Sequence, residues 1–125
     1  MDMRKLRRFF IKEVGIDDIL TEIEPEVDAY GKALAKRGAS APVHGTNGQF
    51  TYVVKNYDIQ RLCELYLQGK VSELHINYLA NLIELSESFK LENDAVREAL
   101  FELSSPELNG PVNEKSVREI IRNLN

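Results

Sequence analysis

Two histidines and one cysteine are the side chains best suited to catalysis or metal binding: His44, His75 and Cys63. Neither histidine has a partner at the spacing of a metal motif such as HExxH. His75 lies in an apolar segment and is expected at the edge of the core. Cys63 is surrounded by leucines typical of a core helix, where burial raises a thiol pKa and lowers its reactivity. We therefore expect no metal site and no cysteine nucleophile, and His44 is left as the one candidate acid or base.

The residues Gly45 to Gly48 read GTNG, which lacks the GxxxxGK[ST] pattern of a phosphate-binding loop. A cluster of carboxylates is the other feature with binding chemistry. Residues 17 to 28 contain no Lys or Arg, and the cluster lacks the spacing and turn glycine of an EF-hand. Its members are Asp17, Asp18, Glu22, Glu24, Glu26 and Asp28.

A basic block precedes the acidic one, because residues 1 to 12 carry five Lys or Arg side chains. One interpretation is that two solvated helix faces attract each other. The other is that the acidic block is a landing site for a basic partner. The overall charge of -4 disfavours a nucleic-acid-binding surface.

Length and composition indicate one domain. The chain has 125 residues, 43% hydrophobic and 29% charged, which suits a single globular core. No apolar run is long enough to span a bilayer, and the N-terminus lacks the pattern of a secretory signal. We therefore expect a cytoplasmic protein without membrane association. One cysteine cannot form an internal disulfide, which agrees with that compartment.

The elements that must position these residues are mainly α-helices. We expect a bundle of about five to six helices within one domain. Residues 1-37 form the N-terminal helices, 38-56 a loop, and 57-125 a helical scaffold. The spacing of apolar residues predicts a helix from Met3 to Val14 that stops at Gly15, and a second from Ile16 to Lys36 that restarts or kinks at Pro25.

The segment before the scaffold is rich in glycine. Asn47-Gly48 is a strong hairpin signal, and the following QFTYVV favours a strand. A two-stranded hairpin is barely stable alone. We therefore expect at most a short hairpin or strand near residues 43-54, or an irregular loop with Phe50 and Tyr52 in the core.

Clear helix signals follow from Tyr57 onward. Gly69 is expected to end the first of these helices, and Ser72 to cap the second. Asn93 or Asp94 and then Asn113 are expected to cap the last two long helices. Short connections make neighbouring helices antiparallel.

Three short motifs in this half carry a family resemblance. They are Tyr66-Leu67-Gln68-Gly69-Lys70, Tyr78-Leu79-Ala80-Asn81, and Ser105-Pro106-Glu107-Leu108-Asn109-Gly110. In these motifs the chain resembles the small helical immunity proteins encoded beside polymorphic toxins, including those of contact-dependent growth inhibition systems. The resemblance implies a non-enzymatic inhibitor without cofactor that binds its cognate toxin, often a nuclease, and blocks the active site or substrate access.

The charge pattern suggests where such a toxin would bind, because a nuclease presents a basic surface to phosphates. We expect the acidic block from Asp17 to Asp28 to bind it, with Tyr30 and Tyr52 as anchors. A helical adaptor or regulatory domain that binds another protein or nucleic acid is the main alternative, and a small enzyme acting through His44 is the third. The oligomeric state stays open.

Overall fold

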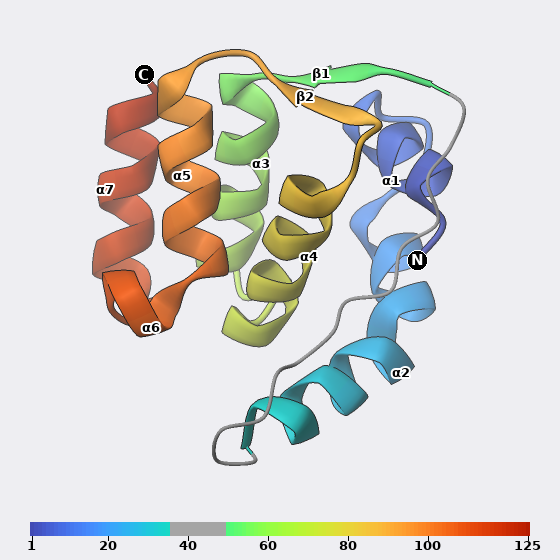
Figure 1. Cartoon of the computed structure of the whole chain (residues 1–125), viewed down its shortest axis with the longest axis horizontal. Coiled ribbons are helices and arrows are strands. Elements are labelled where there is room, and N and C mark those ends of the chain that lie inside the picture. Colours follow the sequence, from blue (N-terminus) through green and yellow to red (C-terminus); the bar gives the residue numbers. More distant parts are fainter. Residues whose placement is uncertain (36–49) are drawn as a thin grey trace.

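The computed structural model describes residues 1–35 and 50–125, and it confirms the mainly helical fold (Figure 1). Its helices outnumber the expected five or six because of a one-turn helix, α6. The helices are α1 Met3–Phe10, α2 Ile16–Ala35, α3 Asn56–Leu67, α4 Glu73–Leu85, α5 Asp94–Ser104, α6 Pro106–Asn109 and α7 Glu114–Leu124. The strands are β1 Tyr52–Val54 and β2 Phe89–Leu91.

The end of α1 differs from the prediction. The helix was expected to stop at Gly15, but its last residue is Phe10. Lys12 adopts φ 67°, the backbone of Glu13 donates to the carbonyl of Arg8 at 2.8 Å, and that of Lys12 to Phe9 at 3.0 Å. This is a Schellman motif with lysine in the position that usually holds glycine. A prediction that looks for glycine therefore placed the end too late.

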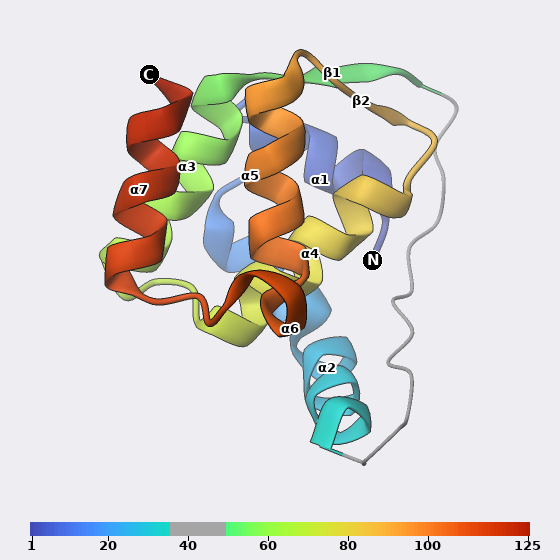
Figure 2. The same ribbon diagram turned by 60° about the vertical axis from the view of Figure 1, so that its left-hand side comes forward.

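Helix α2 continues without interruption through Pro25. Of the two outcomes expected at this proline, a restart is therefore wrong. The apolar positions of α2 face the core, with Ile19 and Ile23 fully buried. The C-terminal half of α2 projects beyond the other helices in both ribbon views (Figures 1 and 2).

Helices α3, α4, α5 and α7 form the scaffold, and α5 contacts each of the other three. The predicted caps are confirmed. The side chain of Ser72 accepts from the N–H of His75, and Asn93 and Asn113 cap α5 and α7 in the same way. Gly69, at φ 78°, ends α3 in a second Schellman motif.

The sheet is parallel. The expected short strand near residues 43-54 is confirmed as β1, whereas the hairpin alternative, with its turn at Asn47-Gly48, lies outside the described residues. Strand β1 pairs with β2, which was not predicted, in the register Tyr52↔Phe89 and Val54↔Leu91. Helices α3 and α4 form the connection between the two strands, as a parallel pair requires. Figure 2 shows the sheet lying across one end of the scaffold. Phe50 and Tyr52 pack against the core, as the loop alternative expected.

One hydrophobic core joins the N-terminal helices to the scaffold, which agrees with a single domain. Tyr78, Phe9 and Leu6 are among its largest fully buried side chains. The guanidinium of Arg61 lies 4.0 Å from the ring centroid of Phe9 and donates to the Phe9 carbonyl at 2.6 Å. Arg61 thereby attaches the C-terminal end of α1 to α3. None of the described helices is long and apolar enough to cross a membrane.

Candidate functional site

The residues with catalytic chemistry have structural roles where the structure describes them. Cys63 is fully buried, and burial raises the pKa of its thiol to about 12, as expected for a small core residue. His75 lies at the edge of the core, where Nδ1 contacts Ser72 and Nε2 is 3.3 Å from Glu24. His44 lies outside the described residues. Within residues 1–35 and 50–125, no three His, Cys, Asp or Glu side chains form a group that could hold a metal ion.

The acidic block divides into two stripes along α2. The inner stripe contains Glu22 and Glu26 and faces the beginning of the chain. Glu22 accepts the backbone N–H of Asp2 at 3.3 Å. Glu26 accepts from the α-amino group of Met1 at 2.9 Å and from the hydroxyl of Tyr78 at 2.7 Å. These two carboxylates are therefore engaged within the protein.

The outer stripe, defined as Asp17, Glu24 and Asp28, points to solvent along one face of the helix, with spacings of seven and four residues. Asp28 forms a 3.0 Å ion pair with Lys32, but both side chains are largely exposed, at 67% and 76%. Such exposed pairs contribute little to stability and are readily exchanged for other partners. Asp18 is also exposed, and it accepts the backbone N–H of Gly15 at 3.3 Å.

Tyr30 belongs to the core rather than to the exposed surface. Its side chain is only 6% exposed, and its ring meets that of Tyr78 edge to face at 5.1 Å. Its hydroxyl donates to Asn77 at 2.6 Å and accepts from Asn81 at 3.1 Å. Burial, and secondarily the charge of Glu107, raises the pKa of Tyr30. The expected role as a partner anchor therefore has no exposed surface to support it.

Tyr52 is half-buried and forms part of a different site. Its ring stacks on Phe10, with centroids 5.6 Å apart, and its hydroxyl donates to Asp58 at 2.9 Å. Asp58 also accepts the backbone N–H of Lys55 at 2.9 Å at the start of α3. Burial raises the pKa of Asp58, although both hydrogen bonds oppose that shift. Burial and then the hydrogen bond to Asp58 also raise the pKa of Tyr52.

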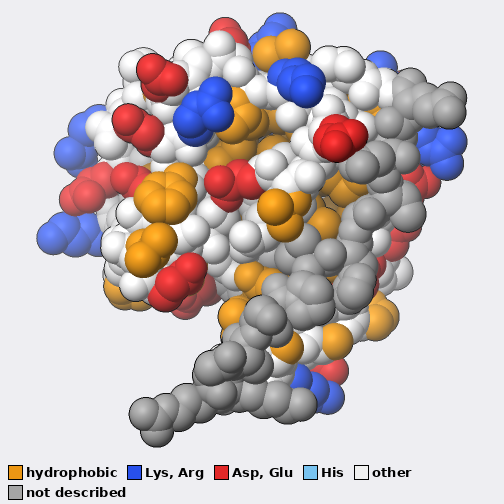
Figure 3. Space-filling view, viewed as in Figure 1, with side chains coloured by type: hydrophobic (Ala, Val, Ile, Leu, Met, Phe, Trp, Pro, Cys, Tyr) orange, Lys and Arg blue, Asp and Glu red, His pale blue; other side chains and the backbone are white. Residues whose placement is uncertain are grey.

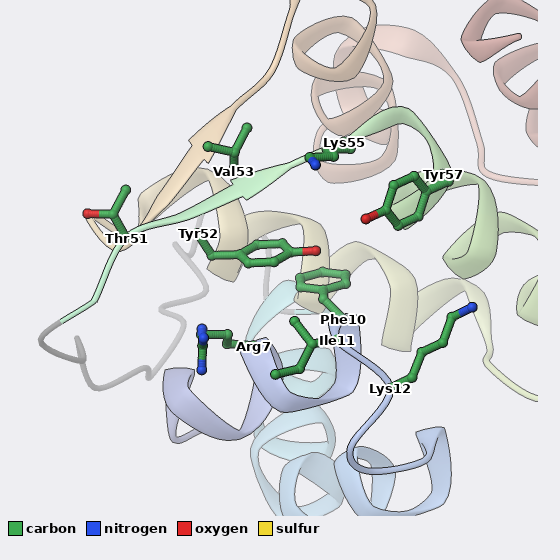
Figure 4. A pocket seen from close by; sticks show the side chains of 9 residues that line it. All are labelled: Arg7, Phe10, Ile11, Lys12, Thr51, Tyr52, Val53, Lys55 and Tyr57. Atoms are coloured by element: carbon green, nitrogen blue, oxygen red, sulfur yellow. The ribbon is translucent and has the colours of Figure 1, made fainter.

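A pocket of about 620 Å³ opens beside Tyr52, between α1, β1 and the first turn of α3 (Figure 4). Its apolar floor includes Phe10 and Ile11. Tyr57 is 53% exposed at its rim. The remaining lining side chains include Arg7, Lys12 and Lys55, a group that we call the basic triad.

The basic triad makes no ion pair with any described carboxylate at the 4.0 Å limit that defines the other pairs. Residues 36–49 contain no Asp or Glu, so they cannot supply one. On the face shown in Figure 3, by contrast, acidic and basic side chains are interspersed over the scaffold helices. The pocket thus concentrates positive charge in an acidic protein.

Sequence reasoning found the acidic block but missed this pocket. The triad comes from the end of α1, the turn after it and the residue before α3, and only the tertiary fold brings these segments together. The basic N-terminal block was the only signal that pointed toward it.

No protein-family model, curated protein or solved structure matches this chain. The resemblance to immunity proteins therefore stays a prediction.

Proposed function

We propose that the chain is an immunity protein that binds a bacterial toxin with a basic surface and blocks its active site or its access to substrate. The observation that supports this proposal is the outer stripe of α2. Its three carboxylates are exposed. Asp28 forms an exposed pair with Lys32, and Glu24 lies 3.3 Å from the partly buried His75.

Exposed carboxylates can affect both the rate at which a partner associates and which partner is selected. A row of exposed carboxylates on one rigid helix attracts a basic surface and accelerates its association, and it disfavours acidic competitors. The buried contacts of α2 hold that row in place, because Ile19, Ile23 and Val27 fix the opposite face in the core. Binding therefore needs little rearrangement of the helix.

The proposal is tested with the protein product of the neighbouring gene as the candidate toxin. The wild type should protect cells from that toxin and bind it in titration calorimetry. The triple variant Asp17→Lys, Glu24→Lys, Asp28→Lys should bind about tenfold or more weakly, with a smaller salt dependence.

A matched control reverses three exposed carboxylates elsewhere: Glu84→Lys, Glu87→Lys and Glu92→Lys. It changes the net charge by the same amount, so it separates the stripe from a general charge effect. Equal affinity of the two triple variants for the toxin would show that the toxin-binding surface is not the outer stripe of α2. If the chain binds the neighbouring gene product but that protein is not toxic, the result would support the adaptor function instead of toxin inhibition.

A further inference from the structure

We propose that the pocket beside β1 binds an extended acidic peptide segment of a protein partner, which adds as a strand to the edge of β1 that faces away from β2. This site is separate from the outer stripe, and it does not depend on the proposed function. Three features support it: the strand edge, the basic triad and the apolar floor.

The strand edge supplies the backbone hydrogen bonds. On the β2 side, the N–H of Tyr52 donates to Ser88 at 2.8 Å, and the carbonyl of Val54 accepts from Glu92 at 3.0 Å. Because hydrogen-bonding directions alternate along a strand, the N–H and carbonyl of Val53 point to the other edge. Among the described residues the sheet has the order β1-β2 only, so they supply no strand at that edge. An added strand is a recurrent mode of peptide recognition at such edges.

The basic triad selects the charge of the segment. Arg7 and Lys12 lie on the α1 side of β1, and Lys55 lies beyond the end of the strand (Figure 4). Arg7 is held over the ring of Phe50 at 5.9 Å, whereas Lys12 and Lys55 are exposed. A strand laid along β1 would therefore pass between positive side chains, which favours Asp or Glu at the positions that face them.

The floor favours apolar side chains between those acidic ones. Phe10 and the ring of Tyr52 stack to form it, and the side chain of Ile11 is 38% exposed beside them. The Tyr52 hydroxyl already donates to Asp58, so it contributes its ring and not a donor. Side chains alternate between the two sides of a strand, so every second residue of the peptide faces α1, and acidic and apolar residues suit these alternate positions.

The cations that line the pocket are spread along the strand rather than gathered around one point (Figure 4). A compact anion would contact one or two of them. An extended acidic chain can reach all three, which is why we favour a peptide over a small ligand.

The test selects ligands from a phage library of random peptides of about ten residues, with the wild-type protein as bait. The recovered peptides should be rich in Asp and Glu. Synthetic versions should bind the variant Arg7→Gln, Lys12→Gln, Lys55→Gln about tenfold or more weakly than the wild type. The matched control Lys70→Gln, Arg97→Gln, Lys115→Gln removes the same charge from one Arg and two Lys side chains that are exposed outside the pocket, and it should bind as the wild type does. Circular dichroism should show both variants folded.

A second measurement tests the strand geometry. N-methylation of every second backbone amide should abolish binding in one register of the peptide and spare it in the other, because only alternate amides face β1.

Four outcomes would each overturn the proposal: no recovered peptides, recovered peptides without acidic enrichment, equal binding to both variants, or insensitivity to both methylation registers. Binding of single-stranded oligothymidylate that the basic triad variant loses would overturn it in favour of nucleic acid. The charge-reversed outer stripe should keep full peptide binding, which separates this test from that of the proposed function.

Discussion

The outer stripe of α2 and the pocket beside β1 are charged regions of opposite sign, built in opposite ways. The stripe lies on one continuous helix, so its spacing is set by the helical repeat alone. The pocket joins the end of α1, a strand and the start of α3. The position of the outer stripe depends on the contacts that hold α2 against α4. The shape of the pocket depends on the hydrogen bonds by which Asp58 holds β1 to α3. These two supports can be removed separately.

The largest effect is expected from Asn77→Ala, which removes the support of α2. Asn77 is buried, accepts from Tyr30 at 2.6 Å and donates to the carbonyls of Leu103 and Ser104 at 3.0 Å. Leaving these groups unpaired should lower the free energy of unfolding by about 3 kcal/mol in urea denaturation. Hydrogen exchange should accelerate in α2 more than in β1. Equal acceleration would show that the two regions are coupled.

The corresponding change on the pocket side is Asp58→Ala. It deprives the hydroxyl of Tyr52 and the backbone N–H of Lys55 of their common acceptor. We expect a loss of about 2 kcal/mol in the free energy of unfolding, since both donors lose their acceptor and the start of α3 loses its cap. Asp58→Asn keeps one carbonyl oxygen as acceptor and should cost less. Equal costs for the two variants would show that the charge, and not the acceptor, matters.

The pH dependence of stability sharpens this comparison. Because the folded pKa of Asp58 is raised by burial, the folded state binds the proton more tightly than the unfolded state. The stabilisation from this proton is complete below the unfolded pKa of about 4 and is lost as pH rises through the folded pKa. The stability of the wild type relative to Asp58→Asn should therefore fall as pH rises. Urea titrations from about pH 3 to about pH 7 measure this difference. A constant or rising difference would contradict the burial argument.

The smallest expected effect is a gain in stability from Lys12→Gly. Lys12 and Gly69 hold the same position in two Schellman motifs, with φ 67° and φ 78°. Glycine adopts this conformation without a Cβ penalty, so Lys12→Gly should stabilise by about 1 kcal/mol, and Gly69→Ala should destabilise by about as much. Thermal unfolding compares the two. A destabilised Lys12→Gly variant would show that its side chain packs usefully at the pocket.

Local signals account for what could be predicted. Ser72, Asn93 and Asn113 each form the predicted cap, because a cap depends on residues within one turn. The acidic block was likewise visible, because it is contiguous. Its division into two stripes was not, since it depends on where Met1 and Tyr78 lie in the fold.

The features that could not be predicted from the sequence depend on contacts between segments that are far apart along the chain. Strand β2 has only three residues, Phe89–Leu91, and its apolar–charged–apolar alternation is too short to distinguish it from a loop. Its partner is separated from it by two helices, so no turn signal connects the strands. The pocket could not be predicted for the same reason, because Arg7, Lys12 and Lys55 are brought together only when the core forms.

The parallel sheet also has a consequence for folding kinetics. A pair of three-residue strands cannot persist alone, and its closure requires α3 and α4 to be in place. We therefore expect the β1–β2 pair to form after the folding transition state. Val54→Ala should accelerate unfolding and leave the refolding rate nearly unchanged in stopped-flow measurements, whereas slower refolding would place the sheet in the nucleus. In the native state, the same strand pair would then open before the described helices do, so the edge of β1 would rearrange while the helical scaffold stays folded.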